Sequence, residues 1–251
     1  MHRFLVLPTD ITPTEVRISG DELNHLTRVL RLGPGDEVEV FDGVGNAYLV
    51  KLTHLSAQEA AGQIIRLLDR KTEPPIQVVL VQGLPKGDKM DLIVQKCTEL
   101  GVTRILPVET ERVVVRLTPE KGRERQRRWQ RIALEAAKQC RRDRVPVIEP
   151  ITTWAQALQN LPDSVWGLLP WEEERRCGLK SLLRQTGLTP KLVYVFIGPE
   201  GGLSSSEIEA AISAGVICVS LGPRILRTET AGLAALTMIL YELGDLGGWR
   251  P

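Results

Sequence analysis

The sequence predicts a small β-barrel followed by a larger α/β domain with a mostly parallel sheet. Short strands crowd residues 1–72 with one short helix among them, as in small barrels. From residue 76 onward, strands alternate with helices, which is typical of α/β domains. The stretch KTEPPI at 71–76 combines charges with two prolines, so we expect domains at 1–72 and 73–251.

The composition is that of an ordinary globular protein. Of the 251 residues, 43% are hydrophobic and 25% are charged, and the formal net charge is +1. No apolar run reaches the roughly 18 residues that cross a bilayer, and the first apolar run is too short for a signal peptide. The four cysteines are scattered, without a CxxC pair or a Cys/His cluster. We therefore expect a cytoplasmic protein with no membrane partner and no metal.

The first domain consists of short segments rich in β-forming residues. A Gly-rich turn, VGN, separates two of them as in a hairpin. The single helix starts near Asp21, which can cap it, and it has Leu23, Leu26 and Leu30 on one face. The expected strands are HRFLVL, EVRIS, EVEVFDG, NAYLVKLTHL and GQIIRLL.

The second domain repeats the order of strand and helix. Ser204 with Glu207 forms a capping box, and Pro119 after Thr118 opens the longest helix. The strands are near-continuous apolar runs, as expected for a sheet covered on both faces, at 76–84, 102–109, 164–171, 191–198 and 216–222. The helices carry apolar residues at helical spacing, at 86–101, 118–142, 152–161, 204–215 and from about Thr228 onward.

Three of these strands end in loops with unusual residues. The loops are GLLPW at 167–171, IGPEGG at 197–202 and LGPRILRTETA at 221–231. Because ligands bind at the carboxyl ends of strands in open α/β sheets, the loops predict one shared pocket. The Gly cluster alone fits a tight strand-to-helix turn equally well. It matches neither the dinucleotide motif GxGxxG nor the P-loop, so a nucleotide-binding enzyme is only a distant alternative.

The longest helix and its flanks concentrate the positive charge of the chain. Residues 112–146 contain twelve Lys or Arg and four Asp or Glu, a net charge of +8. A charge run is usually a solvated helix face. Here the excess has one sign and stands opposite an apolar face, which favours contact with the phosphate backbone of a nucleic acid.

The motifs together resemble those of a known family. The segments HLTRVLR at 25–31, GDEVEVFDG at 35–43, RWQRIALEAAKQCRR at 128–142 and the long motif at 86–112, together with the two C-terminal loops, closely resemble the RsmE family of SPOUT-class methyltransferases. The resemblance covers essentially the whole chain. It implies a PUA-like RNA-binding barrel and an α/β domain whose C-terminal helix threads a deep trefoil knot.

The resemblance also implies the activity. Members use S-adenosylmethionine to methylate N3 of a uridine in 16S ribosomal RNA of the small subunit, and they act as homodimers. A non-catalytic RNA-binding or ribosome-assembly protein is the main alternative. The cofactor-binding residues implied are Leu169, Pro170, Ile197, Gly198, Pro199, Gly201, Gly202, Leu221, Gly222, Ile225, Leu226, Arg227, Thr230 and Ala231.

The chemistry suggests catalytic residues among these loops. A cation near a uracil oxygen would stabilise the N3 anion, and we assign this role to Arg227, with Arg224 behind it. Glu200 or Glu229 can accept the proton, although a carboxylate is a weak base unless it is buried. Equally, Arg227 and Glu229 can serve only as an ion pair, within the chain or across a dimer seam.

Residues that could contact RNA come from both domains. The motif at 25–31 supplies three of them, of which His25 is more often structural. The full set is His25, Arg28, Arg31, Lys86, Lys89, Arg112, Arg116, Arg128, Gln139, Arg141, Arg142 and Arg144.

Overall fold

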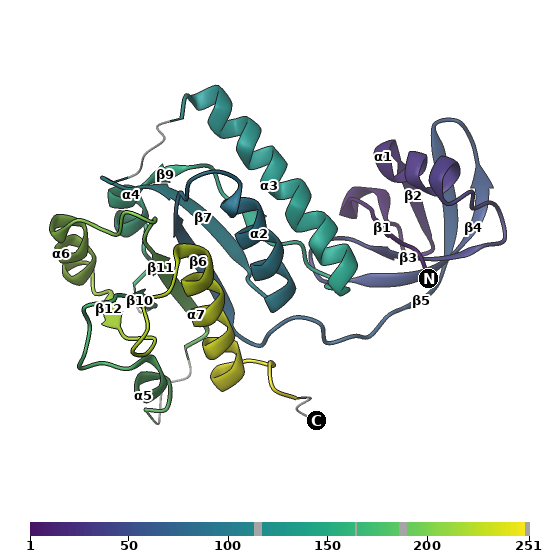
Figure 1. Ribbon diagram of the computed structural model, residues 1–251. Coiled ribbons are helices and arrows are strands. Elements are labelled where there is room, and N and C mark those ends of the chain that lie inside the picture. Colours follow the sequence, from purple (N-terminus) through teal and green to yellow (C-terminus); the bar gives the residue numbers. More distant parts are fainter. Residues whose placement is uncertain (113–116, 164, 186–189, 249–251) are drawn as a thin grey trace. The chain divides into compact units, whose positions relative to one another are not determined.

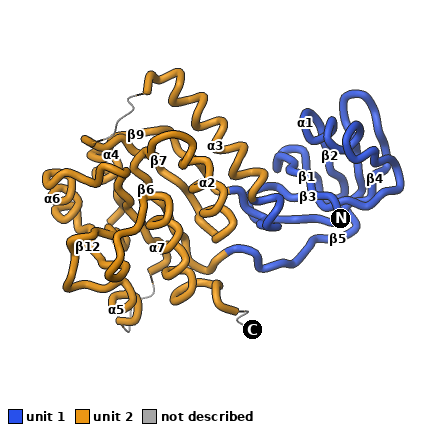
Figure 2. Tube along the Cα trace, in the orientation of Figure 1, with its two compact units in different colours: residues 1–73, 137–145 blue, residues 74–136, 146–251 orange. Residues whose placement is uncertain are grey.

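The computed structural model describes residues 1–112, 117–163, 165–185 and 190–248, and their packing defines two units (Figure 2). The first unit comprises Met1–Glu73 and Ala137–Val145, and the second comprises Pro74–Ala136 and Pro146–Pro251. The sequence predicted that the first domain ends at residue 72 and did not predict that the segment 137–145 belongs to the first unit. That segment contains the last turn of the longest helix, so its assignment depends on contacts that are distant in the sequence.

The first unit contains a five-stranded sheet in the order β1-β3-β4-β5-β2 (Figure 1). Only the β1–β3 pair is parallel among these neighbours. In β2 alternate residues are buried, so Val16 and Ile18 face the core while their neighbours face solvent. The elements are β1 (Arg3–Leu5), η1 (Pro8–Asp10), β2 (Glu15–Ser19), α1 (Gly20–Asn24), η2 (His25–Val29), β3 (Glu37–Phe41), β4 (Ala47–Leu55) and β5 (Glu59–Leu67).

The short helix α1 begins two residues earlier than a cap at Asp21 implies. Ser19 occupies the N-cap position, and its side chain makes no capping hydrogen bond. Asp21 therefore lies in the first turn, where a carboxylate favours the positive end of the helix dipole. The helix continues into η2, a π-helical turn whose buried residue is Leu26.

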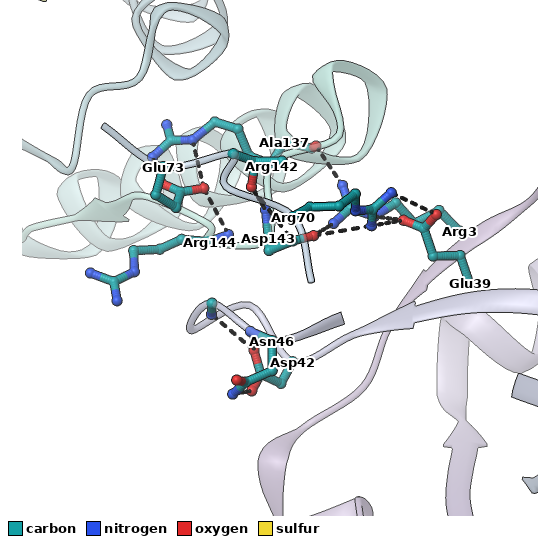
Figure 3. A network of polar contacts seen from close by, with 12 residues as sticks. Arg3, Glu39, Asp42, Asn46, Arg70, Glu73, Ala137, Arg142, Asp143 and Arg144 are labelled. Atoms are coloured by element: carbon teal, nitrogen blue, oxygen red, sulfur yellow. Dashed lines mark hydrogen bonds and ion pairs between the residues drawn. The ribbon is translucent and has the colours of Figure 1, made fainter. Parts of the chain in front are cut away.

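A charge network ties the segment 137–145 to the first unit (Figure 3). The Arg3 guanidinium pairs with Asp143 and with Glu39, whose Oε1 lies 2.7 Å from Arg3 Nε. Arg70 Nη2 lies 2.6 Å from the same Glu39 oxygen. Burial acts to raise the pKa of Glu39, but the hydrogen bond and charge of Arg70, with the charge of Arg3, hold it below its usual value.

The second unit is an α/β structure with parallel strands, as the sequence predicts. Its sheet has the order β12-β10-β11-β6-β7-β8, with β9 paired to β7, and the pairings among its described strands are parallel. The strands are β6 (Gln77–Gly83), β7 (Arg104–Glu109), β8 (Val147–Ile148), β9 (Thr152–Thr153), β10 (Trp166–Pro170), β11 (Leu192–Ile197) and β12 (Ile217–Val219). The two-residue strands β8 and β9 have no signal in the sequence, and Ser164, the expected start of β10, lies outside the described residues.

Helices cover both faces of this sheet (Figure 1). The helices α4 and α6 pack on the face that carries Val79 and Val81 of β6. The opposite face presents Leu80 and Gln82 to α7, which also contacts α2. The helices are α2 (Lys89–Leu100), α3 (Pro119–Cys140), α4 (Trp154–Gln159), α5 (Leu179–Leu183), α6 (Ser205–Ser213) and α7 (Thr228–Leu243).

The expected helix ends are confirmed in several places. Ser204 and Glu207 form the capping box of α6. The longest helix, α3, begins at Pro119, and Gly101 ends α2 with a φ of 107°, a left-handed conformation that favours glycine. Asp88 occupies the N-cap of α2 without a side-chain capping bond. Among the described residues, no helix is both long and apolar enough to cross a bilayer.

Candidate functional site

The strand order of the sheet reverses between β6 and β11, and a cavity lies at the carboxyl ends of these strands. Successive strands extend from β6 through β7 to β8 on one side, while β10 and β12 lie beyond β11 on the other. This is the position at which open α/β sheets bind ligands. The cavity measures about 420 Å³, and residues 170–172, 197–200, 202–203, 225–228, 231 and Lys89 line it.

The three loops that the sequence singled out therefore meet at one cavity. Each loop follows the carboxyl end of its own strand, β10, β11 or β12. Most of the residues predicted to bind the cofactor lie in the lining, namely Pro170, Ile197, Gly198, Pro199, Gly202, Ile225, Leu226, Arg227 and Ala231. Their convergence was expected from the parallel sheet alone, whereas their contact with a cofactor stays a prediction.

Other predicted cofactor residues lie outside this lining. Leu169 is fully buried within β10. Leu221 and Gly222 line a second, smaller cavity of about 70 Å³, which shares Pro170, Ile225, Leu226 and Ala231 with the first. Gly201 and Thr230 also stand outside the lining; the Gly201 carbonyl accepts a hydrogen bond of 3.2 Å from Arg112 Nη1. For these five residues, contact with the cofactor through backbone groups or apolar side chains stays a prediction.

The loop at 197–202 is held in one shape by close backbone contacts. A Cβ on Gly83, at the end of β6, would lie 2.8 Å from both the nitrogen and Cδ of Pro199, so only glycine fits there. Gly202 has a φ of 68°, and its N–H donates to the Pro199 carbonyl at 2.9 Å. The Gly cluster is thus a tight turn between a strand and a helix, as one of its two interpretations predicted, and this turn also forms the cavity wall.

Three charged side chains form a cluster at the cavity. Lys89 Nζ lies 2.8 Å from Oε1 of Glu200 and 3.3 Å from Oε2 of Glu229. The Lys86 backbone N–H also donates to Glu200. Burial acts to raise the pKa of Glu200, but these hydrogen bonds and the Lys89 charge hold it below its ordinary value. Glu200 is therefore a weak proton acceptor in this structure, and its predicted role as a base is disfavoured.

Arg227 lines the cavity with its charge available. It precedes α7 as the N-cap residue and its side chain is exposed. Among the described residues, Arg227 forms no ion pair, because Glu229 pairs with Lys89 instead. The alternative that Arg227 and Glu229 only pair with each other inside the chain is therefore wrong, and the guanidinium can meet a ligand.

The sequence interpretation missed several lining residues. Trp171 and Glu172 follow β10 directly, Leu203 closes the glycine loop, and Thr228 begins α7. The first two had a usable signal, since Trp171 ends the singled-out stretch at 167–171 and Glu172 follows it. Thr228 had a signal too, since it lies within the loop at 221–231 that the sequence analysis singled out.

The predicted RNA contacts vary in exposure. Three exposed residues belong to the second unit, namely Lys86, Arg112 and Arg128, of which Arg128 pairs with Asp91. Five belong to the first unit, namely His25, Arg28, Arg31, Gln139 and Arg141. Arg144 is half-buried and donates to the Val44 carbonyl. Arg142 is buried and its Nη2 lies 2.6 Å from Glu73 Oε2, which argues against its predicted contact with RNA. Arg116 lies outside the described residues.

Comparisons with known proteins place the chain in a class. Residues 72–240 match the family model described as an RNA methyltransferase domain, and residues 18–69 match the RNA methyltransferase PUA domain. A parallel α/β fold with a cavity at its strand ends agrees with that match. Fold, cavity and family model together define an RNA methyltransferase.

Relatives narrow the class to one family. The ribosomal RNA small subunit methyltransferase E of Bacillus subtilis is 36% identical, over 92% of this chain and 91% of the relative. That of Neisseria gonorrhoeae, solved bound to S-adenosyl methionine, has a TM-score of 0.86 at 35% identity, covering 98% of this chain and 99% of that one. A putative methyltransferase of Legionella pneumophila, solved with bound SAM, has a TM-score of 0.84 at 29% identity, covering 97% and 98%. The chain belongs to the ribosomal RNA small subunit methyltransferase E family, which confirms the resemblance seen in its motifs.

Proposed function

We propose that this protein transfers the methyl group of S-adenosylmethionine to N3 of a uridine in 16S ribosomal RNA. The observation that carries the proposal is the cavity of about 420 Å³ formed by the three predicted loops. The family supports it, since the Neisseria relative of nearly the same length was solved with S-adenosyl methionine bound.

The residues of the cavity fit this cofactor. Ile197, Leu203 and Leu226 provide apolar walls for an adenine, and the loops offer backbone N–H and C=O groups for its polar edge. The carboxylates of Glu172 and Glu200 provide negative charge for a ligand that carries a sulfonium and an amine. When bound, the cofactor supplies the electrophilic methyl group.

The chain's own residues would prepare the uridine. N3 loses a proton and forms a bond to the methyl carbon as the S–C bond breaks, leaving S-adenosylhomocysteine. Arg227 would stabilise the N3 anion through a uracil oxygen, with Arg224 behind it. Of the two carboxylates, we assign the role of proton acceptor to Glu229, whose side chain is 15% exposed, because the pKa of Glu200 is lowered.

RNA binding is assigned to both units. In the second unit the exposed residues Lys86, Arg112 and Arg128, together with the arginines of α3, would bind phosphates. In the first unit His25 and Arg28 on η2, and Arg31 just after it, belong to the stretch matched by the PUA model. We assign that unit the closed barrel and the RNA-holding role that the motifs imply.

The remaining expectations concern the knot, the dimer and the compartment. Packing of α7 on α2, β6 and β11 is consistent with a helix threaded through a deep trefoil knot. The exposed side chains of Met238 and Tyr241 on α7 support a homodimer, because apolar side chains on a helix face favour a partner. The cytoplasm is the compartment in which the ribosomal substrate would be met.

Methyl transfer to small ribosomal subunits that lack this modification tests the proposal. Tritium from labelled S-adenosylmethionine should appear as N3-methyluridine with the wild-type protein. Arg227→Ala should keep cofactor binding but reduce kcat by about 10²-fold or more, whereas Arg17→Ala, an exposed arginine of the first unit, should match the wild type. Full activity of Arg227→Ala would remove the arginine's role. Bound RNA without any transfer would favour the non-catalytic RNA-binding protein.

A further inference from the structure

Gln82 is a fully buried polar residue within an otherwise apolar strand. It is 0% exposed near the end of β6, where the other buried residues are apolar or glycine. A buried amide is unfavourable unless it forms hydrogen bonds. Nε2 of Gln82 donates to the Gly83 carbonyl and to Thr228 Oγ1, each at 2.9 Å. Its Oε1 is buried without a hydrogen-bond partner among the described residues, so only the donor side of the amide is in use.

Thr228 connects Gln82 by hydrogen bonds to the loop that forms the cavity wall. Its hydroxyl has one proton, and because it accepts from Gln82 it is free to donate that proton. Thr228 Oγ1 donates to the Gly198 carbonyl at 2.6 Å. The direction of the chain of bonds is thereby fixed, from the Gln82 amide through the Thr228 hydroxyl to Gly198.

This chain of bonds ends at the cavity. Gly198 and Thr228 both line it. The end of β6 packs tightly on the same loop, since a Cβ on Gly83 would collide with Pro199. The Lys89 ion pairs join the same two segments near the solvent, through Glu200 in the loop and Glu229 in α7. The buried contact is uncharged, so salt and pH affect it far less than the ion pairs.

We propose that Thr228, oriented by Gln82, is the positioning residue that sets the loop at 197–202 for the methyl donor. The inference rests on the proposed function, because it takes the cavity to be the cofactor site. Thr228 acts through the Gly198 carbonyl and takes no part in the chemistry itself. Removing its hydroxyl leaves that carbonyl without its donor and removes the buried hydrogen bond between the loop and α7, while the Lys89 ion pairs stay in place.

The test compares cofactor affinity with stability. Thr228→Val should raise the Kd for S-adenosylmethionine, measured by calorimetry, and its KM about tenfold, with a smaller change in kcat. Thr228→Ser keeps the hydroxyl and should restore both values. Thr98→Val is the matched control, since Thr98 is a buried threonine of the same unit whose hydroxyl donates to Val94 inside α2. It should lower the midpoint of thermal unfolding and leave the Kd unchanged.

A double-mutant cycle tests the link to Gln82. Gln82→Leu should raise the Kd as Thr228→Val does, and the double variant should be no worse than either single variant, because both remove one chain of bonds. Additive effects would overturn the role of Gln82. An unchanged Kd in a folded Thr228→Val protein would overturn the inference while leaving the proposed function intact. A wild-type protein that binds no S-adenosylmethionine would instead overturn the proposed function.

Discussion

Among single residues, Lys89 shows that the role of a charged side chain depends on its partners in the fold. In the sequence it is one more cation on a path for RNA. In the structure it joins α2 to two carboxylates, Glu200 in the cavity loop and Glu229 in α7. Its pKa is raised, first by the hydrogen bond to Glu200. Lys89 therefore forms ion pairs with two carboxylates beside the cavity and helps to lower the pKa of Glu200, and a direct contact with RNA stays a prediction.

Replacing Lys89 should change the pH dependence of the reaction. In Lys89→Met, Glu200 loses the hydrogen bond and the charge that lower its pKa, so the pKa of Glu200 rises. We expect kcat/KM to fall about tenfold and the acidic limb of its pH profile to move to higher pH. Lys96→Met is the control, because Lys96 also lies on α2 but pairs with Glu99. An unshifted limb in the Lys89 variant would show that neither carboxylate affects the reaction.

Among the secondary-structure elements, α3 combines an apolar stripe with a cationic surface. Trp129 and Ala133 are buried in the second unit, while Arg123, Arg127 and Arg131 are exposed at a spacing of four residues. Residues at this spacing share one helix face. The one-signed charge counted in the sequence is therefore displayed on a surface, as contact with a phosphate backbone requires.

Removing this stripe of charge should weaken RNA binding by a salt-dependent amount. The triple variant with Arg123, Arg127 and Arg131 each changed to Gln should lower the slope of log Kd against log salt. The decrease should reach about 0.7–0.9 for each phosphate that is no longer neutralised. Calorimetry should give an unchanged Kd for S-adenosylmethionine, because these residues lie outside the cavity lining. A slope equal to that of the wild type would place the RNA on another surface.

In the molecule as a whole, the chain leaves the first unit after Glu73 and returns to it at Ala137. The segment 137–145 belongs to a unit that otherwise ends at Glu73. Glu39 pairs with Arg3 and Arg70, and Arg3 extends the network to Asp143 on the returning segment. The association depends on buried ion pairs, which are costly to break when only one partner is removed.

Removing the Glu39 charge should destabilise the protein in a pH-dependent way. Glu39→Gln leaves Arg3 and Arg70 short of one counterion, which should cost about 3–5 kcal/mol at neutral pH. The folded pKa of Glu39 is lowered, so its contribution is present above the ordinary value and is lost as pH falls through the folded pKa. The raised pKa of Asp143, caused first by burial, acts in the opposite direction in both proteins.

Urea unfolding at pH 7 and at pH 4 or below would measure this effect. The difference in unfolding free energy between the wild type and Glu39→Gln should shrink as the pH falls. Glu37→Gln is the control, because Glu37 is an exposed residue of the same strand. A difference that stays constant with pH would mean that packing, rather than charge, sets the effect.

Local patterns in the sequence were enough to predict the parts of this protein that depend on neighbours along the chain. The alternation of strands and helices, the helix starts at Ser204 and Pro119 and the loops after β10, β11 and β12 all follow from such patterns. Because parallel strands end at one edge of a sheet, the same patterns also predicted where the cavity lies. The motifs then indicated the family, and with it the cofactor and the substrate class.

The meeting of distant side chains, in contrast, became visible only in the folded chain. Gln82 and Thr228 are 146 positions apart, and no periodicity connects them. The same holds for Lys89 with its two carboxylates, for the buried Arg142, and for the return of 137–145 to the first unit. The pattern that marks a strand or a helix is carried by residues close in sequence, whereas these contacts arise when packing of the core brings separate elements together.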